Sequence, residues 1–224
     1  KEYVSAFEDK SRLDLLFIQY LQNGGMPPLI NFPETSYKSY IEEVVNNIIQ
    51  KDVLVRHKWH NEEHFYKTIE FLFDAIGSTI STQKITTRLQ ATGVKVSHNT
   101  IGNYIDALTE CYLFYKTKRF DLKGKNLLMT QEKYYTVDLA FKRYFLSEKE
   151  TSDLGHNLEN IVYLELLRRG NRVYIGKADN TEIDFVIQTP KGDREYIQVA
   201  WSTWDESIWQ REIRPFELIK DYNK

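Results

Sequence analysis

The chain has 224 residues, of which 42% are hydrophobic and 28% are charged, and its net charge is −2. This composition is ordinary for one large folded domain or two small ones, and it excludes a disordered chain. A net charge so close to zero also excludes an overall basic field, so any nucleic-acid binding has to come from a local patch.

The cysteine content and the hydropathy pattern narrow the cellular setting. Cys111 is the single cysteine, so an internal disulfide is excluded, and we expect a buried thiol rather than a nucleophile. No apolar run approaches the roughly 18 residues of a membrane span, and no secretory signal opens the chain. A cytoplasmic location without membrane partners is therefore expected. The sequence begins at Lys1 rather than at a methionine, which indicates a piece of a longer protein.

Residues 1–60 are expected to form a mainly helical region. Apolar side chains recur at spacings of three and four between Leu13 and Leu21, which is the period of an amphipathic helix. The run Gly24-Gly25-Met26-Pro27-Pro28 breaks this pattern, because proline removes a backbone donor and glycine frees the backbone. A second helix is expected to begin near Thr35-Ser36.

Three histidines follow at helical spacing. His57, His60 and His64 could place their imidazoles on one face and offer a zinc site. The acidic pair Glu62-Glu63 interrupts the stretch and no cysteine accompanies it, so an ordinary solvated helix is the favoured interpretation.

Residues 61–146 are interpreted as a winged-helix domain. Three helices are expected, at residues 65–76, 81–93 and 97–110. Gly77 and Gly93 end the first two, and Ser97 is the N-cap of the third. Two strands are expected after them, at residues 113–120 and 133–137. Two helices joined by a short glycine-containing turn are typical of a helix-turn-helix motif, and the loop between the strands would be the wing.

A DNA complex of this domain would use the third helix and the wing. The helix presents Asn99 and Asn103, which can read adenine, but Asp106 and Glu110 beside them repel phosphates. The basic side chains of the wing are Lys116, Lys118, Arg119, Lys123 and Lys125. Such a cluster binds phosphates without reading sequence. The alternative interpretation is a solvated hairpin in a packing or protein-interaction module.

A short helix is expected at 139–146, and the polar run 147–153 is the candidate domain boundary. Beyond it, one helix and three strands are expected, at residues 157–169, 173–176, 182–187 and 196–201. This order indicates a mixed α+β or α/β chain, in which the helical winged-helix domain precedes an αβββα core over residues 153–224. This core is expected to be incomplete at its C-terminal end and to continue past Lys224.

Side-chain alternation in this core predicts a set of oxygen ligands. Glu182 and Asp184 share one face of their strand, and Gln198 lies on one face of the next strand. If these faces coincide, Asp184 and Gln198 lie side by side, and Glu159 reaches in from the helix. Two carboxylates and an amide oxygen suit Mg²⁺ or Mn²⁺, so these residues are the candidate catalytic and metal-binding set.

One position argues against catalysis by this set. Metal-dependent phosphodiester hydrolysis commonly uses a lysine two residues after the third ligand, and that position is Ala200. Losing one such charge-stabilising donor typically costs about 10²–10³ in kcat. Lys177, at the end of the preceding strand, is a conceivable substitute.

Residues 157–200 resemble the PD-(D/E)XK restriction-endonuclease superfamily, with Glu159, Asp184 and Gln198 at the acidic and third-ligand positions. Several short runs together resemble the C-terminal region of prokaryotic AAA-type ATPases, catalogued as domain of unknown function 4143. These runs are Gly24-Gly25-Met26-Pro27, Gly77-Ser78, Lys118-Arg119-Phe120-Asp121, Lys133-Tyr134-Tyr135, Leu158-Glu159-Asn160, Arg168-Arg169-Gly170, Glu182-Ile183-Asp184-Phe185 and Ile197-Gln198-Val199. The resemblance implies an ATP-binding domain before residue 1, with residues 1–60 linking it to the winged helix and the nuclease-like domain.

Three functions are consistent with these patterns. The favoured one is a DNA-associated module of an ATPase, with a winged helix and a degenerate nuclease-like core. The others are an active Mg²⁺-dependent nuclease that tolerates Ala200, and a scaffold that binds proteins and has no catalytic site. The oligomeric state stays open.

Overall fold

The computed structural model describes residues 2–7, 9–57, 59, 61–146, 153–179 and 181–219, apart from the side chains of residues 129 and 130. The chain divides into two compact units, each assembled from separate stretches. The first, called the helical unit, contains residues 1–75, 82–115 and 136–154. The second, called the sheet unit, contains residues 76–81, 116–135 and 155–224.

The expected domains at 1–60, 61–146 and 153–224 do not coincide with these two units. The reason is that residues 116–135, which include the expected wing, join the strands of residues 172–197 in one sheet. Except for Asp153, the expected boundary at 147–153 lies outside the described residues.

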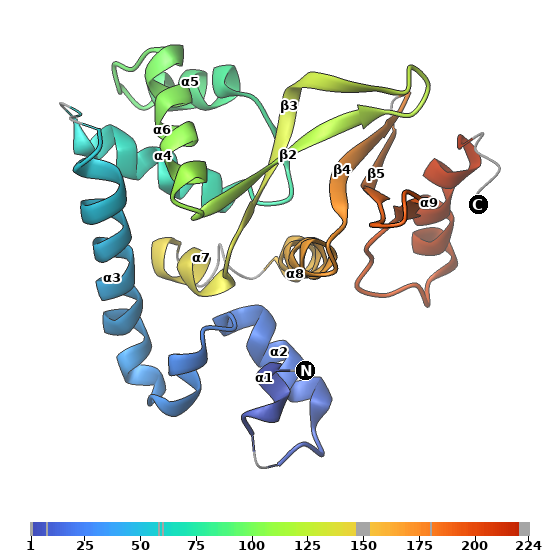
Figure 1. Ribbon diagram of the computed structural model, residues 1–224, viewed down its shortest axis with the longest axis horizontal. Helices are drawn as coiled ribbons and strands as arrows, with labels where there is room; N and C mark the ends of the chain where they lie inside the picture. The colour runs from blue at the N-terminus through green and yellow to red at the C-terminus, as the bar shows by residue number, and fades with distance from the viewer. Residues whose placement is uncertain are drawn as a thin grey trace. The chain divides into compact units, whose positions relative to one another are not determined.

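The helical unit is built from helices joined by short turns. Its elements are α1 (Glu2–Ser5), α2 (Leu13–Asn23), the 3-10 helices η1 (Pro27–Asn31) and η2 (Glu34–Ser36), α3 (Tyr37–Asn47), the π-helix η3 (Ile48–Leu54), α4 (Glu62–Asp74), α5 (Thr82–Ala91), α6 (His98–Glu110) and α7 (Leu139–Phe145). In Figure 1, α4, α5 and α6 lie close together, and α4 packs on both α6 and α7.

The helical periodicity read from the sequence is confirmed in α4 and α6. Phe65 and Ile69 of α4 are buried, as are Ile101 and Leu108 of α6, because residues three or four apart face the same side of a helix. The Ser97 hydroxyl accepts the backbone N–H three residues later at 3.1 Å, which confirms it as the N-cap of α6.

The run that breaks the first helix has a structural partner far away in the sequence. Asp138, the N-cap of α7, accepts the backbone N–H of Ala140 at 2.8 Å and that of Gly25 at 3.0 Å. Gly24 has a φ of +82°, and a Cβ at this position would lie 2.0 Å from the Asp138 carboxylate. A glycine is therefore required at position 24. Burial raises the pKa of the Asp138 carboxyl above its ordinary value. This run fixes the packing of α2 on α7.

The sheet unit carries a six-stranded sheet in the order β1-β3-β2-β4-β5-β6 within the described residues. Its elements are β1 (Thr79–Ile80), β2 (Phe114–Asp121), β3 (Asn126–Thr136), α8 (Leu154–Arg168), β4 (Arg172–Ala178), β5 (Thr181–Gln188), β6 (Arg194–Ile197) and α9 (Glu206–Glu217). The mixed α+β class is thereby confirmed. β2 runs parallel to β4, whereas β1 with β3, β4 with β5 and β5 with β6 are antiparallel. In Figure 1, β2 and β3 form a long twisted hairpin, and α8 is seen end-on beside it.

The strand expected at 196–201 is wrong at its end, because β6 stops at Ile197. The next backbone groups are bound by side chains instead of by the sheet. The Asp184 carboxylate accepts the N–H of Val199 at 2.8 Å, and the Gln198 amide oxygen accepts the N–H of Asp184 at 3.2 Å. These two bonds replace the next pair of sheet hydrogen bonds, so Ala200 lies beyond the strand.

No helix in the described part of the chain combines the length and the apolar character that crossing a bilayer would demand.

Candidate functional site

The candidate site forms where side chains from strands that are not neighbours in the sheet meet below α8. Lys133 lies on β3 and Glu182 lies on β5, and two strands separate them in the sheet order. Their charged groups are nevertheless only 2.6 Å apart. Thr79 of β1 reaches the same carboxylate, donating its hydroxyl at 3.0 Å. The sheet therefore curves strongly enough to bring β1, β3 and β5 around one point.

Lys133 is the centre of this arrangement. The residue is 3% exposed, and its ammonium lies 3.0 Å from the Glu159 carboxylate as well as 2.6 Å from that of Glu182. Burial by itself would lower the pKa of Lys133, but the two carboxylates outweigh it and raise the pKa above the ordinary value. A charge so deeply buried is stable only when it is paired in this way.

Glu159 is bound by two donors on the same oxygen. Besides Lys133, the Tyr135 hydroxyl donates to Glu159 Oε1 at 2.6 Å. Tyr135 is held in place because its ring stacks on that of Tyr163, with centroids 4.2 Å apart. Burial, and then the Glu159 charge, raise the pKa of Tyr135 well above its ordinary value, so the hydroxyl keeps its proton.

Gly77 makes room for the first turns of α8. It has a φ of +74°, and a Cβ there would lie 2.8 Å from His156 and 3.2 Å from Glu159 Oε2. The Gly77-Ser78 run of the resemblance therefore has a steric reason, because a larger residue would push α8 and its carboxylate out of place.

Asp184 is the titratable member of the cluster. Burial, followed by the negative charge of Glu159, raises the pKa of Asp184 to about 7, whereas the N–H of Val199 and the Lys133 ammonium oppose the rise. A carboxyl that is half protonated at neutral pH because of burial and a charged neighbour is a common mark of a functional site.

Gln198 is occupied at both ends of its amide. Its oxygen accepts the backbone N–H of Asp184, and its nitrogen donates to Glu212 of α9 at 2.9 Å. Glu212 is paired in turn with Arg211 at 2.7 Å. The amide thus ties β6 and α9 to β5.

The predicted ligands Glu159, Asp184 and Gln198 lie in one region, and three of their oxygens already accept hydrogen bonds. Glu159 Oε1 is taken by an ammonium and a hydroxyl, and the Gln198 oxygen faces a backbone N–H. Within the ranges that the structure describes, no three His, Cys, Asp or Glu side chains are grouped to hold a metal ion. The cluster contains an internal cation, the Lys133 ammonium.

Lys133, Tyr135 and Glu182 are the cluster members that were not assigned a role from the sequence. A signal for each was nonetheless present. Lys133 and Tyr135 belong to a run that contributed to the resemblance, and Glu182 shares a strand face with Asp184.

The histidine triplet cannot be assembled from the described residues, because His60 lies outside them. The His57 ring stacks on Trp59 with centroids 4.9 Å apart, and the His64 ring contacts the Asn61 amide at 3.1 Å. Both described imidazoles therefore have ordinary packing or capping contacts.

The predicted nucleic-acid contacts fall into two groups. Asn99 and Asn103 are exposed on α6 in the helical unit. The basic residues belong to β2 and to the turn that follows it, and all but Arg119 are exposed. Arg119 is 8% exposed and donates to Gln131, because it lies on the covered face of β2, so its guanidinium is not presented at the surface.

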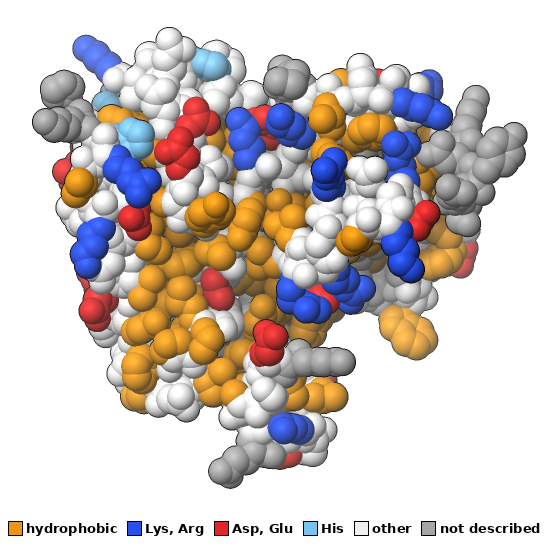
Figure 2. All heavy atoms as spheres, in the orientation of Figure 1, with side chains coloured by type: hydrophobic (Ala, Val, Ile, Leu, Met, Phe, Trp, Pro, Cys, Tyr) orange, Lys and Arg blue, Asp and Glu red, His pale blue; other side chains and the backbone are white. Residues whose placement is uncertain are grey.

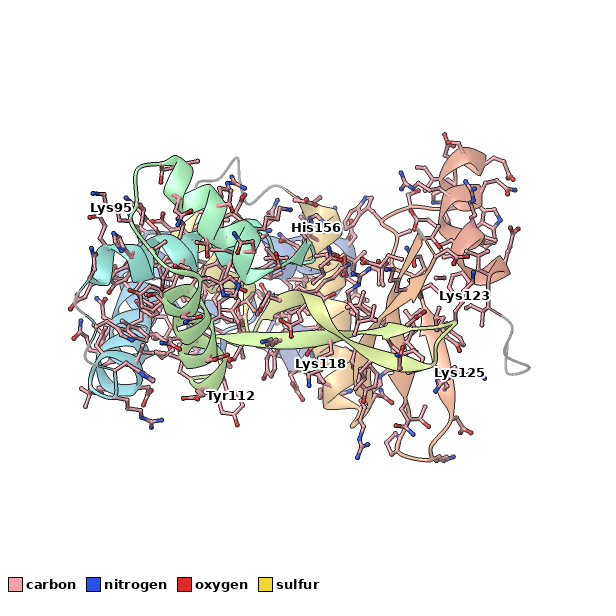
Figure 3. All side chains as sticks on the ribbon, turned by 90° about the horizontal axis from the view of Figure 1, so that it is seen from above. Lys95, Tyr112, Lys118, Lys123, Lys125 and His156 are labelled. Carbon is pink, nitrogen blue, oxygen red and sulfur yellow. The ribbon has the colours of Figure 1, made fainter. Side chains whose placement is uncertain are left out.

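Figure 3 shows Lys123 and Lys125 at the tip of the β2–β3 hairpin and Lys118 further along it. These three lysines are called the hairpin lysines. Figure 2 shows Lys and Arg side chains gathered over the same hairpin. Some of this charge is balanced locally, since Lys123 lies 2.6 Å from Asp179 and Lys116 lies 3.2 Å from Glu132.

Comparisons with known proteins found one family model and two relatives that match this chain. A family model described as domain of unknown function (DUF8612) matches residues 14–152. An uncharacterised protein of Haemophilus influenzae is 35% identical over 205 residues, which cover 90% of this chain and 50% of that protein. The uncharacterised protein MJ1544 of Methanocaldococcus jannaschii is 30% identical over 220 residues, covering 95% of this chain and 48% of that protein. The chain thus spans about half the length of these curated relatives. No solved structure is a significant match.

Proposed function

The chain belongs to the family described as domain of unknown function DUF8612, and from this premise we propose that it is a DNA-associated module of a longer ATPase. In this proposal the sheet unit is a nuclease-like core that contacts nucleic acid and does not cleave it. The supporting observation is the distribution of charge in that unit, where the hairpin lysines are exposed while Glu159 and Glu182 are paired with the buried Lys133.

The hairpin lysines suit a phosphate backbone. Lys118 lies on β2, Lys123 and Lys125 lie in the turn after it, and all three are exposed. Point charges of this kind neutralise phosphates and release counter-ions, which gives binding that is independent of sequence and weakened by salt. Because the net charge of the chain is only −2, phosphate binding is expected at this patch rather than over the whole surface.

The carboxylate cluster supports contact without cleavage. A hydrolytic site of the resembled type needs oxygen ligands open to a metal and an ammonium that touches the phosphate. Here the amide of Gln198 is engaged, position 200 is an alanine beyond the strand, and Lys133 is buried between two carboxylates. Lys177 lies on β4, opposite Glu182 in the β4–β5 register, and is therefore not at the position two residues after Gln198.

The ATPase part of the proposal concerns the half of the relatives that this chain does not cover. The resemblance to the C-terminal region of AAA-type ATPases implies that ATP binds in that other half. ATP hydrolysis there would then move or load the DNA-contacting module described here.

The DNA proposal is tested by fluorescence anisotropy with a labelled 20-base-pair duplex and with a single strand, over a series of NaCl concentrations. The purified chain is compared with a triple variant, Lys118→Ala, Lys123→Ala and Lys125→Ala. Because each phosphate contact contributes about 0.9 to the slope of log K against log salt, we expect a shallower slope and affinity at least about tenfold weaker.

The matched control is Lys191→Ala combined with Lys95→Ala, which removes exposed lysines outside the hairpin. This control should leave the slope of the unaltered chain unchanged. If the unaltered chain shows no salt-dependent binding, or if the triple variant binds as tightly as the control, the proposed DNA contact is wrong.

The same preparation tests the alternative of an active nuclease. Supercoiled and single-stranded DNA are incubated with Mg²⁺ or Mn²⁺ and with Asp184→Ala as the control. We expect no cleavage that depends on Asp184. Metal-dependent cleavage that disappears in Asp184→Ala would replace the proposal with the nuclease.

A second candidate function, a protein-interaction scaffold, is favoured by the segment before and within α9. Trp204 is 97% exposed, Trp201 is 50% exposed and Trp209 is 44% exposed. Exposed tryptophans are typical anchors of protein interfaces. If the duplex and the single strand both fail to bind at 50 mM NaCl while the chain is folded, this scaffold is the better description.

A further inference from the structure

We infer that the Lys133 ammonium is a built-in replacement for a divalent cation, and that removing it converts the cluster into a metal-binding site. The inference deepens the proposed function, since it takes the cluster as the nuclease-like site of the sheet unit. It can nevertheless fail while the DNA contact at the hairpin stands, because the two are measured by different experiments.

The first step is the position of the charge. One positive group contacts carboxylate oxygens from α8 and from β5, at 3.0 Å and 2.6 Å. These two oxygens can be at most 5.6 Å apart, the sum of the two distances. A Ca²⁺ ion with ligands at about 2.3–2.6 Å bridges nearly that span, so the carboxylates would need to approach by about 1 Å at most.

Three carboxyl groups surround the Lys133 ammonium. Glu159, Glu182 and Asp184 are close enough that each acts on the pKa of Lys133. Hard oxygen donors of this type suit Ca²⁺, Mn²⁺ and lanthanide ions. Without Lys133 the region would hold three carboxyls, and the buried Glu159 would keep the hydrogen bond from the Tyr135 hydroxyl. Such a group either takes up protons or binds a cation.

The burial of Lys133 excludes direct contact between its ammonium and a substrate. Its side chain is 4% exposed and both ion pairs are short, so the ammonium has no surface on which to contact a phosphate. Lys133 therefore does not replace the ammonium missing at Ala200. Its charge is used inside the protein, as a metal ion's charge would be.

The experiment compares the unaltered chain with Lys133→Met and Lys133→Gln. Terbium(III), which has ligand preferences similar to those of Ca²⁺, is titrated while tyrosine is excited, because Tyr135 lies next to the expected ion. Calorimetric titration with CaCl₂ gives an independent affinity. Removing one positive charge a few ångströms from the ion is expected to tighten cation binding by about 100-fold or more.

Two controls locate the bound ion. Lys191→Met removes an exposed lysine in the turn at 190–193 and should bind no more tightly than the unaltered chain. The double variant Lys133→Met with Glu159→Gln should lose the gained terbium emission, because one of the bridging carboxylates is gone.

Stability provides the readout if the variants fold poorly. Lys133→Met and Lys133→Gln are expected to melt lower than the unaltered chain without metal and to recover in millimolar CaCl₂, because a ligand that binds only the folded state stabilises it. The inference is overturned if the unaltered chain binds terbium as tightly as the variants. It is equally overturned if both variants gain no affinity, or if both stay unfolded in CaCl₂, because the cation then cannot take the place of the ammonium.

Discussion

The two faces of one hairpin use lysine in opposite ways. Lys133 on β3 is 3% exposed, and its charge is consumed by two carboxylates within the protein. Lys118 on β2 and Lys123 at the turn are exposed, and Lys123 lies 2.6 Å from the exposed Asp179 carboxylate. The residue type and the local sequence are similar, and the side of the sheet decides the role.

The buried lysine and the exposed lysines are therefore expected to affect different properties of the protein. Inside, the cost of burying ions makes every partner of Lys133 matter, since losing one leaves another unpaired. Outside, water and salt screen each lysine, so single residues matter little for stability and act together on a polyanion. Internal variants should therefore change stability, and hairpin variants should change binding.

The largest expected effect is on the buried side. Lys133→Met leaves Glu159 and Glu182 facing each other without a cation and should lower the free energy of unfolding by about 3–5 kcal/mol. Lys118→Met, its exposed counterpart, should change it by less than about 0.5 kcal/mol. Urea denaturation followed by circular dichroism measures both. Similar losses in the two variants would remove the distinction between the two faces.

The next effect is a dependence of stability on pH. The pKa of Asp184 is raised to about 7 in the folded chain, against about 3.9 when unfolded, so the folded state binds more protons between these values. The contribution of Asp184 to stability should therefore fall as the pH rises from about 4 to 7, by an amount on the order of 2–3 kcal/mol. Asp184→Asn should flatten the profile across this window.

The control for that profile is a carboxyl shifted in the opposite direction. Arg168 and Arg169 lower the pKa of Glu165 to about 2, so its stabilising contribution is lost only as the pH falls below about 4.5. Glu165→Gln should leave the profile between pH 5 and 7 as it is. A profile that stays steep in Asp184→Asn would mean that another group carries the dependence.

The local elements could be predicted from the sequence because each depends on neighbours along the chain. Helix α6 follows from its apolar period and the Ser97 cap, and β5 follows from the alternation around Asp184. The end of β6 could not be predicted, because side-chain bonds of Asp184 and Gln198 replace the sheet bonds there.

The contacts between distant segments lie beyond any local pattern. The pairing of Lys133 with Glu182 joins strands that are not adjacent in the sheet, so it depends on the curvature of the whole sheet. The burial of Arg119 likewise depends on distant segments, because β2 pairs with β4 and the hairpin is part of a larger sheet rather than a free wing. The charged residues are known from the sequence, but which of them form ion pairs inside the protein depends on the folded sheet.

A smaller effect on the buried side tests the hydroxyl that supports Glu159. Tyr135→Phe keeps the ring stack on Tyr163 and removes a hydrogen bond to a charged group, so unfolding should require about 1.5–3 kcal/mol less. Tyr112→Phe, at a tyrosine that is 68% exposed, serves as the control and should be nearly neutral. Thermal denaturation of both variants decides the matter, and a neutral Tyr135→Phe would show that Lys133 suffices to hold Glu159.

The smallest expected effect concerns Lys123, whose contribution to stability is compared with its contribution to DNA binding. Lys123 lies 2.6 Å from Asp179, and both side chains are largely exposed, so Lys123→Ala should change stability by less than about 1 kcal/mol. In the DNA titration it should reduce the salt slope by about one contact. Asp179→Asn should act in the opposite direction, strengthening binding by about two- to threefold, because it removes a charge that competes with phosphate for Lys123. If Asp179→Asn weakens binding instead, the carboxylate positions Lys123 for the phosphate, and the exposed pair is then a built contact like the buried one.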